Sequence, residues 1–239
     1  MKVSHHAASI AIFPERTRER ILVAVYDEGY PVVPFRGHYC LIGGNAPGKN
    51  GDASPRATLE RELTEEFGLE KQEDEELAGV TYKATELEGR FADRKELEQI
   101  RQAIIPTPFA DYLVMVSGKF RGKPDDAQLL CSAHYAGIGN AAFELVEARL
   151  REGKIIRAEG LTRILTLDEV TNGKVRGAWG YGQILGDMLN LRGFRGVPEY
   201  PFPNLVVARV GEVLGSYAKY KVEGVEYQKD PEKAPEPKS

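Results

Sequence analysis

Cysteine is scarce in this chain, which has only Cys40 and Cys131. Neither lies in a Cys-x-x-Cys pair, so the sequence excludes a disulfide framework and argues against a thiolate zinc site. The 4 histidines show no His-x-x-x-His or His-Glu-x-x-His spacing, which argues against a zinc hydrolase. We therefore expect two reduced, buried thiols and no zinc.

Long apolar runs and an excess of positive charge are also missing. No uninterrupted apolar stretch of about 18 residues occurs, and residues 1–6 lack the apolar core of a secretory signal. We therefore expect a cytoplasmic protein without membrane contact. The 32 Lys and Arg against 36 Asp and Glu give a net charge of −4. Since binding to duplex nucleic acid requires a basic surface, we expect no such partner.

The composition is that of an ordinary globular protein, with 42% hydrophobic and 28% charged residues over 239 positions. A chain of this size buries a sizeable core without disulfides or a structural metal. We expect a catalytic domain over residues 1–195 and an extension over 196–227 that packs on it. From 228 to 239 the chain is mostly Pro, Lys and Glu, so this tail is expected to be disordered.

Segments typical of strands and of helices alternate along the chain, which predicts an α/β or α+β fold in layers. Short apolar runs at 9–13 and 21–26 surround a polar link and predict paired antiparallel strands. The breaker-rich segment 43–51 is expected to be a loop. Further strands are expected at 31–35, 39–42, 111–120 and 161–167. Helices are expected at 96–105, 141–152, 179–191 and 206–220.

The clearest helix signal begins at Ser54, a suitable N-cap, and Pro55 fits the first helical position. The helix is expected to run to about Phe67, with Gly68 in the left-handed position beyond its end. At roughly 100° per residue, one side of this helix is an apolar stripe. Its members are Leu59, Leu63 and Phe67.

The glutamates Glu62, Glu65 and Glu66 form an arc beside this stripe and not on the opposite, solvent side. Like charges at this spacing repel, and desolvation at the edge of a core adds to the cost. A hard divalent cation removes that cost, so the pattern favours Mg²⁺ or Mn²⁺. Arg61 lies four residues before Glu65 and is placed to pair with it. A solvated acidic helix face is the competing interpretation.

The surrounding residues resemble the box of the Nudix hydrolase family, Gly-x5-Glu-x7-Arg-Glu-u-x-Glu-Glu-x-Gly-u, where u is apolar. Gly43 and Gly44 resemble the glycine pair at its start. The order of expected strands and helices also fits, so the resemblance spans roughly residues 1–195. The second half of the box is matched at every defined position, by Arg61, Glu62, Leu63, Glu65, Glu66, Gly68 and Leu69.

The resemblance implies a Nudix-like mixed β-sheet layered between helices, with a helical C-terminal extension. It also implies a Mg²⁺-dependent pyrophosphohydrolase that cleaves a nucleoside diphosphate linked to a nucleotide, ADP-ribose or a sugar. The metal ligands would be Glu62, Glu65 and Glu66, with the Gly44 carbonyl as an extra ligand, Gly43 and Gly44 near the substrate, and Arg61 orienting Glu65.

Family members often use a further acidic residue outside the box as general base. We prefer Glu144, because it begins a helix face just after a Gly-x-Gly turn. The other candidates are Glu147, Glu152 and Glu159.

The first half of the box departs from the family pattern. Seven residues separate Gly44 from Asp52 and eight separate Asp52 from Arg61, where the family has five and seven. Asp52 is therefore expected to stand in for the first glutamate of the box, with small insertions on either side. The altered loop gives no substrate assignment.

Two other functions are compatible with parts of the sequence. Residues 137–142 fit Gly-x-Gly-x-x-Ala before a helix, a pattern of dinucleotide-binding proteins. The preceding residues 132–135 look like a poor buried strand, which argues against it. The other alternative is a non-catalytic Nudix-like protein that binds a nucleotide or a partner protein. Core packing or a homodimer interface is expected for an apolar stripe at Ala142, Leu145, Val146 and Leu150.

Overall fold

A computed structural model describes residues 5–46, 52, 54–67, 75–77, 80–82, 90–117, 126–157, 161–190, 205–209, 220–222 and 225–227. Its helices are α1 (Pro55–Glu66), α3 (Arg94–Ala103), α4 (Asn140–Arg151), α5 (Leu167–Thr171), α6 (Tyr181–Met188) and the 3-10 helix η1 (Val33–Phe35). The strands up to β6 are β1 (His5–Pro14), β2 (Arg20–Val25), β3 (Tyr39–Cys40), β4 (Ile42–Asn45), β5 (Glu75–Leu77) and β6 (Val80–Tyr82). The later strands are β7 (Thr107–Ser117), β8 (Asp126–Ile138), β9 (Leu161–Thr166), β10 (Leu205–Arg209), β11 (Tyr220–Val222) and β12 (Val225–Tyr227).

One eight-stranded sheet organises the described residues. Its order is β10-β7-β8-β1-β2-β3, with β4 also paired to β1 and β9 to β2. β1 and β8 run parallel, whereas β1 and β2 form the antiparallel pair expected from the sequence. The chain therefore has the predicted mixed α+β fold. The helices expected near 96–105, 141–152 and 179–191 correspond to α3, α4 and α6.

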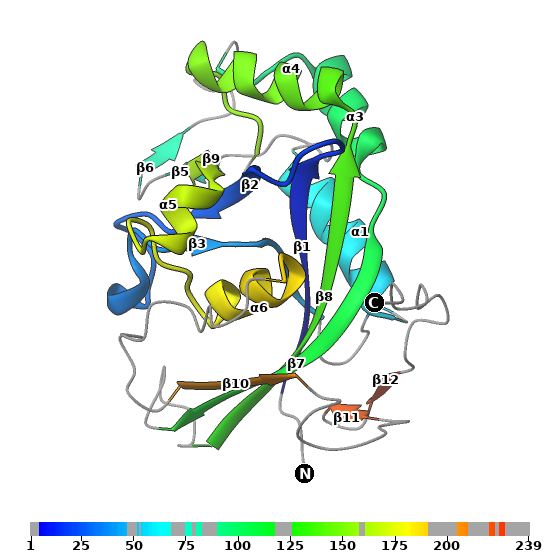
Figure 1. Cartoon of the computed structure of the whole chain (residues 1–239), viewed down its shortest axis with the longest axis vertical. Coiled ribbons are helices and arrows are strands. Elements are labelled where there is room, and N and C mark those ends of the chain that lie inside the picture. Colours follow the sequence, from blue (N-terminus) through cyan, green and yellow to red (C-terminus); the bar gives the residue numbers. More distant parts are fainter. Residues whose placement is uncertain are drawn as a thin grey trace.

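Side chains of the central strands alternate between two cores, as a pleated strand requires. Ile10 and Ile12 of β1 pack in a core with residues of α1, α3 and α4. Ala11 and Phe13 point the other way and pack with residues of α5 and α6. In Figure 1, α1 lies to the right and α6 to the left of β1 and β8, while α4 crosses the upper end. The sheet is thus covered by helices on both faces.

Three expected elements differ from the structure. Residues 33–35 form η1 instead of a strand, because Pro31 and Pro34 cannot donate ladder hydrogen bonds. The expected loop 43–51 begins as β4, whose backbone pairs with β1. The helix expected at 206–220 is wrong where the structure describes it. Residues Leu205–Arg209 form β10, which adds to the edge offered by β7.

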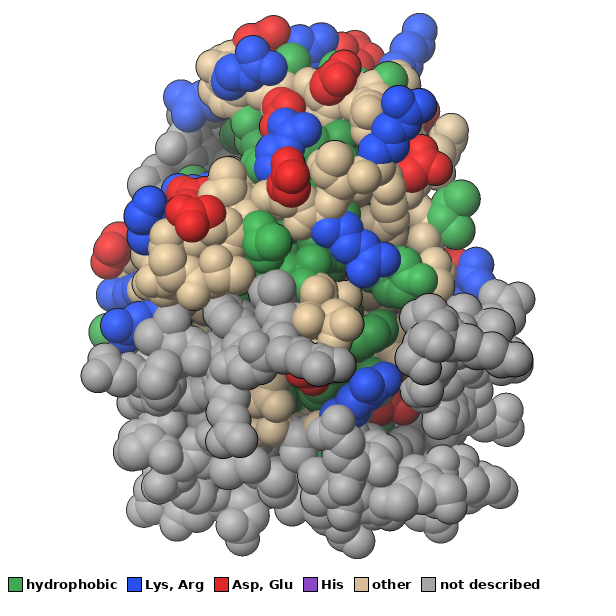
Figure 2. Space-filling view, viewed as in Figure 1, with side chains coloured by type: hydrophobic (Ala, Val, Ile, Leu, Met, Phe, Trp, Pro, Cys, Tyr) green, Lys and Arg blue, Asp and Glu red, His purple; other side chains and the backbone are tan. Residues whose placement is uncertain are grey.

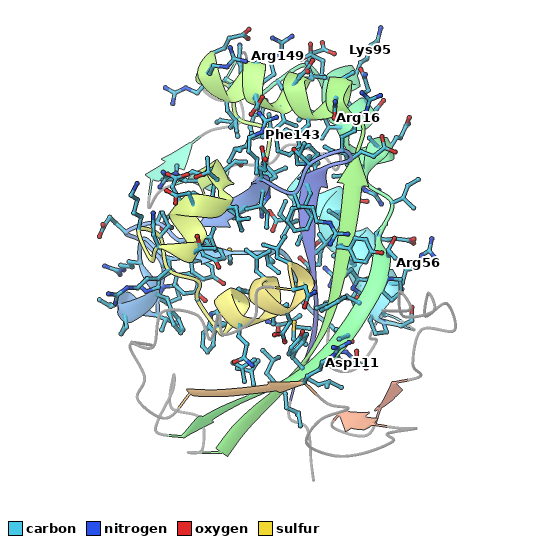
Figure 3. The ribbon with its side chains drawn as sticks, viewed as in Figure 1. Arg16, Arg56, Lys95, Asp111, Phe143 and Arg149 are labelled. Carbon is cyan, nitrogen blue, oxygen red and sulfur yellow. The ribbon has the colours of Figure 1, made fainter. Side chains whose placement is uncertain are left out.

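The helical cap at the upper end of the molecule combines apolar contacts and ion pairs. Figure 3 shows Phe143 beneath α4, where it is buried in the core shared with α1. Arg149 of α4 pairs with Glu96 of α3 and with Glu152. On the coloured part of the face in Figure 2, acidic and basic side chains are intermixed. Among the described residues, no helix is both long and apolar enough to cross a membrane.

Candidate active site

Helix α1 carries the acidic cluster and is fixed by local signals and by its apolar stripe. Ser54 is the N-cap, its Oγ accepts a hydrogen bond from the Ala57 N–H at 3.1 Å, and Pro55 follows as expected. The stripe residues Leu59, Leu63 and Phe67 are 0% exposed. Because this side of α1 is held on the sheet, the neighbouring glutamates are held at its edge.

The two glycines of β4 bring backbone and carboxylate into close approach. Gly43 has φ +138°, and a Cβ there would overlap the Ala8 carbonyl on β1. A Cβ on Gly44 would overlap the carboxylate of Glu62. Gly43 therefore requires glycine, because its clash is with backbone. At Gly44 a side chain would displace the Glu62 carboxylate, so the Gly44 backbone forms a cradle for that carboxylate.

Arg61 is the centre of an ion-pair network. Its Nη1 donates to Glu65 Oε2 at 2.7 Å, and its Nη2 lies 2.8 Å from Glu62 Oε1. Its Nε donates to Asp52 Oδ2 at 3.2 Å, and Nη2 also donates to the Asn45 carbonyl at 3.1 Å. The predicted Arg61–Glu65 pair is therefore present. Asp52, expected to replace the first glutamate of the box, lies in the same network.

The network and partial burial shift two pKa values. Burial raises the pKa of Glu62, the Arg61 guanidinium opposes this, and the charges of Glu65 and Glu66 add to the rise. The net pKa of Glu62 is raised, so its negative charge is costly in the metal-free protein. Burial acts to lower the pKa of Arg61, but its pairs with Glu65, Glu62 and Asp52 outweigh burial and raise it.

Glu66 faces a different arginine. Its side chain is 7% exposed, and its Oε2 pairs with Nη2 of Arg157, whose side chain is 2% exposed. Arg157 follows Ile156, a buried residue of the core under α1. Nothing local in the sequence marks Arg157 as a partner of the box. The buried pair depends on the path of the chain after α4.

The donor chemistry of the cluster fits a divalent cation. Asp52, Glu62, Glu65 and Glu66 are four carboxylates, and their ion pairs involve two guanidinium groups, Arg61 and Arg157. With all groups ionised, two negative charges are left, and oxygen donors suit Mg²⁺ or Mn²⁺. Within the described ranges, however, no three His, Cys, Asp or Glu side chains converge closely enough to hold a metal. The arginines lie among the carboxylates instead.

A chain of polar side chains that sequence analysis missed lies in the sheet beneath α1. The Ser132 hydroxyl donates to Asp111 Oδ1 at 2.9 Å and is 3.0 Å from Nε2 of His6. Gly44, Ala8, Ser132 and Asp111 occupy one row across β4, β1, β8 and β7. Three strand spacings place Asp111 roughly 14 Å from Gly44. Figure 3 shows Asp111 at the part of β7 distant from α4. No local motif links these three residues.

Among the described residues, the glutamates that the sequence suggests as general base are not part of the ion-pair network around Arg61. Glu144 is exposed on α4 and is not part of the Arg61 network. Glu147 pairs with Arg20, and Glu152 with Arg149. Glu159 lies outside the described residues.

The expected dinucleotide turn is the junction of β8 and α4. Gly139 is the N-cap of α4, and nothing lies within 4 Å of a Cβ built on it, so no backbone approach requires glycine there. The view of residues 132–135 as a poor strand is wrong. They belong to β8, which is parallel to β1, and His134 is 1% exposed. The polar residues Ser132 and His134 argue against a buried strand in the sequence. In the structure both have hydrogen-bond partners inside the sheet, Asp111 for the Ser132 hydroxyl and the Ser132 carbonyl for the His134 ring.

The two cysteines agree with the expectation of buried free thiols. Both are free and buried. Burial raises the pKa of Cys131 to about 11, although its contact with the Ser9 hydroxyl opposes the rise. A thiol with this pKa is almost entirely protonated at neutral pH.

Comparisons with known proteins support a likeness in structure only. A mutT/nudix family protein from Listeria innocua is 16% identical, with a TM-score of 0.43 over 80% of this chain and 94% of that one. A MutT protein from Methanosarcina mazei Go1 is 13% identical, with a TM-score of 0.43 over 80% and 98%. A NUDIX hydrolase from Alicyclobacillus acidocaldarius is 12% identical, with a TM-score of 0.38 over 77% and 92%.

No protein-family model matches the chain. No curated protein matches it either. Identities this low do not transfer an activity or a substrate. In fold, the chain is similar to these three Nudix or MutT proteins.

Proposed function

We propose that this chain is a Mg²⁺- or Mn²⁺-dependent pyrophosphohydrolase of the Nudix type. Its substrate is a nucleoside diphosphate linked to another moiety, such as a nucleotide, ADP-ribose or a sugar. The supporting observation is the placement of the Glu62 carboxylate against the Gly44 backbone, in a cluster with more carboxylates than guanidinium groups. A solvated acidic helix face would need neither the glycine cradle nor the partial burial.

In this proposal Glu62, Glu65 and Glu66 hold the cation, with the Gly44 carbonyl as an additional ligand. A bound divalent cation supplies charge neutralisation for the diphosphate and activation of the attacking water. Arg61 holds Glu65 in place through the 2.7 Å bond of its Nη1. Gly43 and Gly44 carry no side chains of their own, and the Gly44 backbone lies directly against the Glu62 carboxylate, so a cation held by Glu62 would lie beside the β4 backbone. Catalysis then rests on positioning and electrostatics.

The test is a panel of nucleoside diphosphate compounds incubated with Mg²⁺ or Mn²⁺, with products identified by mass. Release of a nucleoside monophosphate supports the proposal. Glu65→Gln and Glu66→Gln are each expected to lose most turnover, by about 10²-fold or more. Near-normal rates in both variants would refute the assigned site.

The second candidate function is a non-catalytic protein that binds a nucleotide or a partner. The observation in its favour is that arginines, within the described residues, lie among the carboxylates and no three acidic, His or Cys side chains converge. This alternative predicts that neither Mg²⁺ nor Mn²⁺ binds and that no diphosphate is cleaved. A calorimetric titration with each metal separates the two functions.

Several further assignments are proposals as well. We infer that Glu144 is the general base, which predicts a lower kcat for Glu144→Gln and the loss of the acidic limb of the pH–rate profile. We also propose the domain division at 195 and 227, a cytoplasmic location and a homodimer. The stripe of α4 that first indicated the dimer packs in the core of the protein. A dimer therefore has to use another surface, and sedimentation of the full chain tests for it.

A further inference from the structure

The Glu66–Arg157 ion pair joins the acidic helix to a distant segment of the chain. The side chains are 7% and 2% exposed. The backbone before Arg157 is fixed, since the Ile155 N–H donates to the Arg90 carbonyl at 2.9 Å and Ile155 accepts from Ala92 at 2.8 Å. The side chain of Ile156 is 0% exposed. The backbone hydrogen bonds of Ile155 and the buried side chain of Ile156 therefore hold Arg157 in place independently of Glu66.

Burial makes this pair difficult to break. A guanidinium group does not lose its proton in proteins, so Arg157 stays charged wherever it lies. Removing the partner of a buried charge is strongly destabilising, because the remaining charge is left inside without compensation. A movement of Glu66 away from Arg157 would bear such a cost. Glu66 is thus held by Arg157 whether or not a cation is nearby.

One oxygen of the Glu66 carboxylate, Oε2, is the atom that pairs with Arg157. Oε2 faces Arg157 and is fully buried, so the small exposure of the side chain does not come from this atom. An ionised carboxylate has acceptor sites on both oxygens and is able to serve an arginine and a cation together. Partners that orient a ligating carboxylate typically change metal affinity by about 10–100-fold when removed.

We propose that Arg157 is a positioning residue of the metal site. By holding Oε2 of Glu66, it fixes the direction in which Oε1 is presented to a divalent cation. This role rests on the proposed function, because it requires that the box binds a metal. It differs from that of Arg61, which pairs with the half-exposed Glu65 on the same helix.

The test measures Mn²⁺ affinity of the full chain by electron paramagnetic resonance, which follows the free hydrated ion and needs no turnover. Arg157→Met is expected to weaken Mn²⁺ binding about 10–100-fold. Arg157→Lys keeps the charge but not the planar fork and is expected to recover part of the affinity. The matched control is Arg149→Met, which removes an arginine that pairs with Glu96 and Glu152, and it should leave the affinity unchanged.

A double-mutant cycle tests whether Arg157 acts through Glu66. If it does, Glu66→Gln combined with Arg157→Met binds Mn²⁺ no more weakly than Glu66→Gln alone. If Arg157→Met proves too unstable, Arg157→Lys carries the test, through a weaker affinity and an altered line shape of bound Mn²⁺.

Unchanged or tighter Mn²⁺ binding in the folded Arg157 variants overturns the positioning role and leaves the proposed function standing. A wild-type chain that binds no Mn²⁺ overturns both. Additive losses in the double variant also overturn the role, because Arg157 would then act independently of Glu66.

Discussion

The two ends of the acidic cluster use ion pairs in opposite environments. Arg61 and Glu65 are 29% and 40% exposed and belong to the same helix. Arg157 and Glu66 are 2% and 7% exposed and belong to segments far apart in the sequence. An exposed pair contributes roughly 0–1 kcal/mol and mainly restricts side-chain direction. A buried pair becomes a structural requirement once both charges are inside. Adjacent glutamates of one helical turn therefore have different roles in stability.

The largest expected effect contrasts Glu66→Gln with Glu65→Gln in metal-free protein. Glu66→Gln leaves the buried Arg157 charge without its carboxylate and is expected to lower the free energy of unfolding by about 3–5 kcal/mol. Glu65→Gln removes a half-exposed pair and is expected to cost less than about 1 kcal/mol. Urea unfolding in EDTA, followed by circular dichroism, measures both. Equal losses in the free energy of unfolding would show that burial does not make the Glu66–Arg157 pair more important for stability than the Arg61–Glu65 pair.

The same contrast is sharpened by removing both members of the buried pair. Glu66→Met combined with Arg157→Met replaces two charges by apolar side chains and is expected to recover most of the stability that either single change loses. A double variant as unstable as Arg157→Met would mean that packing and not charge is responsible.

The second prediction concerns the glycine cradle of Glu62. A methyl group on Gly44 would overlap the Glu62 carboxylate and push this flexible side chain aside. Gly44→Ala is expected to reduce turnover on the order of 10²-fold, because a small misplacement near the reacting groups is costly. The matched control, Gly139→Ala, enters open space and should stay within about twofold. The ratio of initial rates at saturating Mg²⁺ gives the result. Similar losses of turnover in both variants would show that the contact between Gly44 and the Glu62 carboxylate is not needed for activity.

Local signals account for the parts of the molecule that the sequence predicted well. Ser54 and Pro55 lie next to the helix that they begin, and the stripe with Leu59 as its first member repeats within that helix. The spacing predicts Arg61 as the partner of Glu65, because a separation of four residues on a helix brings two side chains together. In each case the cause lies within one or two helical turns.

Tertiary contacts decide the parts that were missed. Arg157 meets Glu66 only because the chain returns to α1 after α4, and no spacing encodes that return. Ser132 in β8 is polar, which argues against a buried strand in the sequence, yet Asp111 on the neighbouring strand accepts a hydrogen bond from its hydroxyl. β10 forms because β7 offers a free sheet edge for pairing. The sequence of residues 205–209 by itself does not show that this edge is available. Contacts of this kind can be predicted only after the order of the strands in the sheet is known.

The smallest expected effect concerns Glu62, whose side chain is 15% exposed and so lies between the two extremes. Its pKa is raised in the folded chain, mainly by burial. Between the ordinary glutamate pKa and the raised one, the folded state binds more protons than the unfolded state. Stability therefore falls as pH rises through this window, and the loss is complete above it.

Glutamine imitates the protonated carboxyl, so metal-free Glu62→Gln is expected to unfold on the order of 2 °C higher than wild type at pH 7.5. The gain should vanish below the ordinary glutamate pKa, where wild type is protonated in both states. Scanning calorimetry in EDTA at the two pH values measures it. Saturating Mg²⁺ should reverse the order, because the wild type, with all three carboxylates, gains more stability from the cation than the variant does. A variant less stable than wild type in EDTA would mean that the Arg61 pair outweighs burial at Glu62.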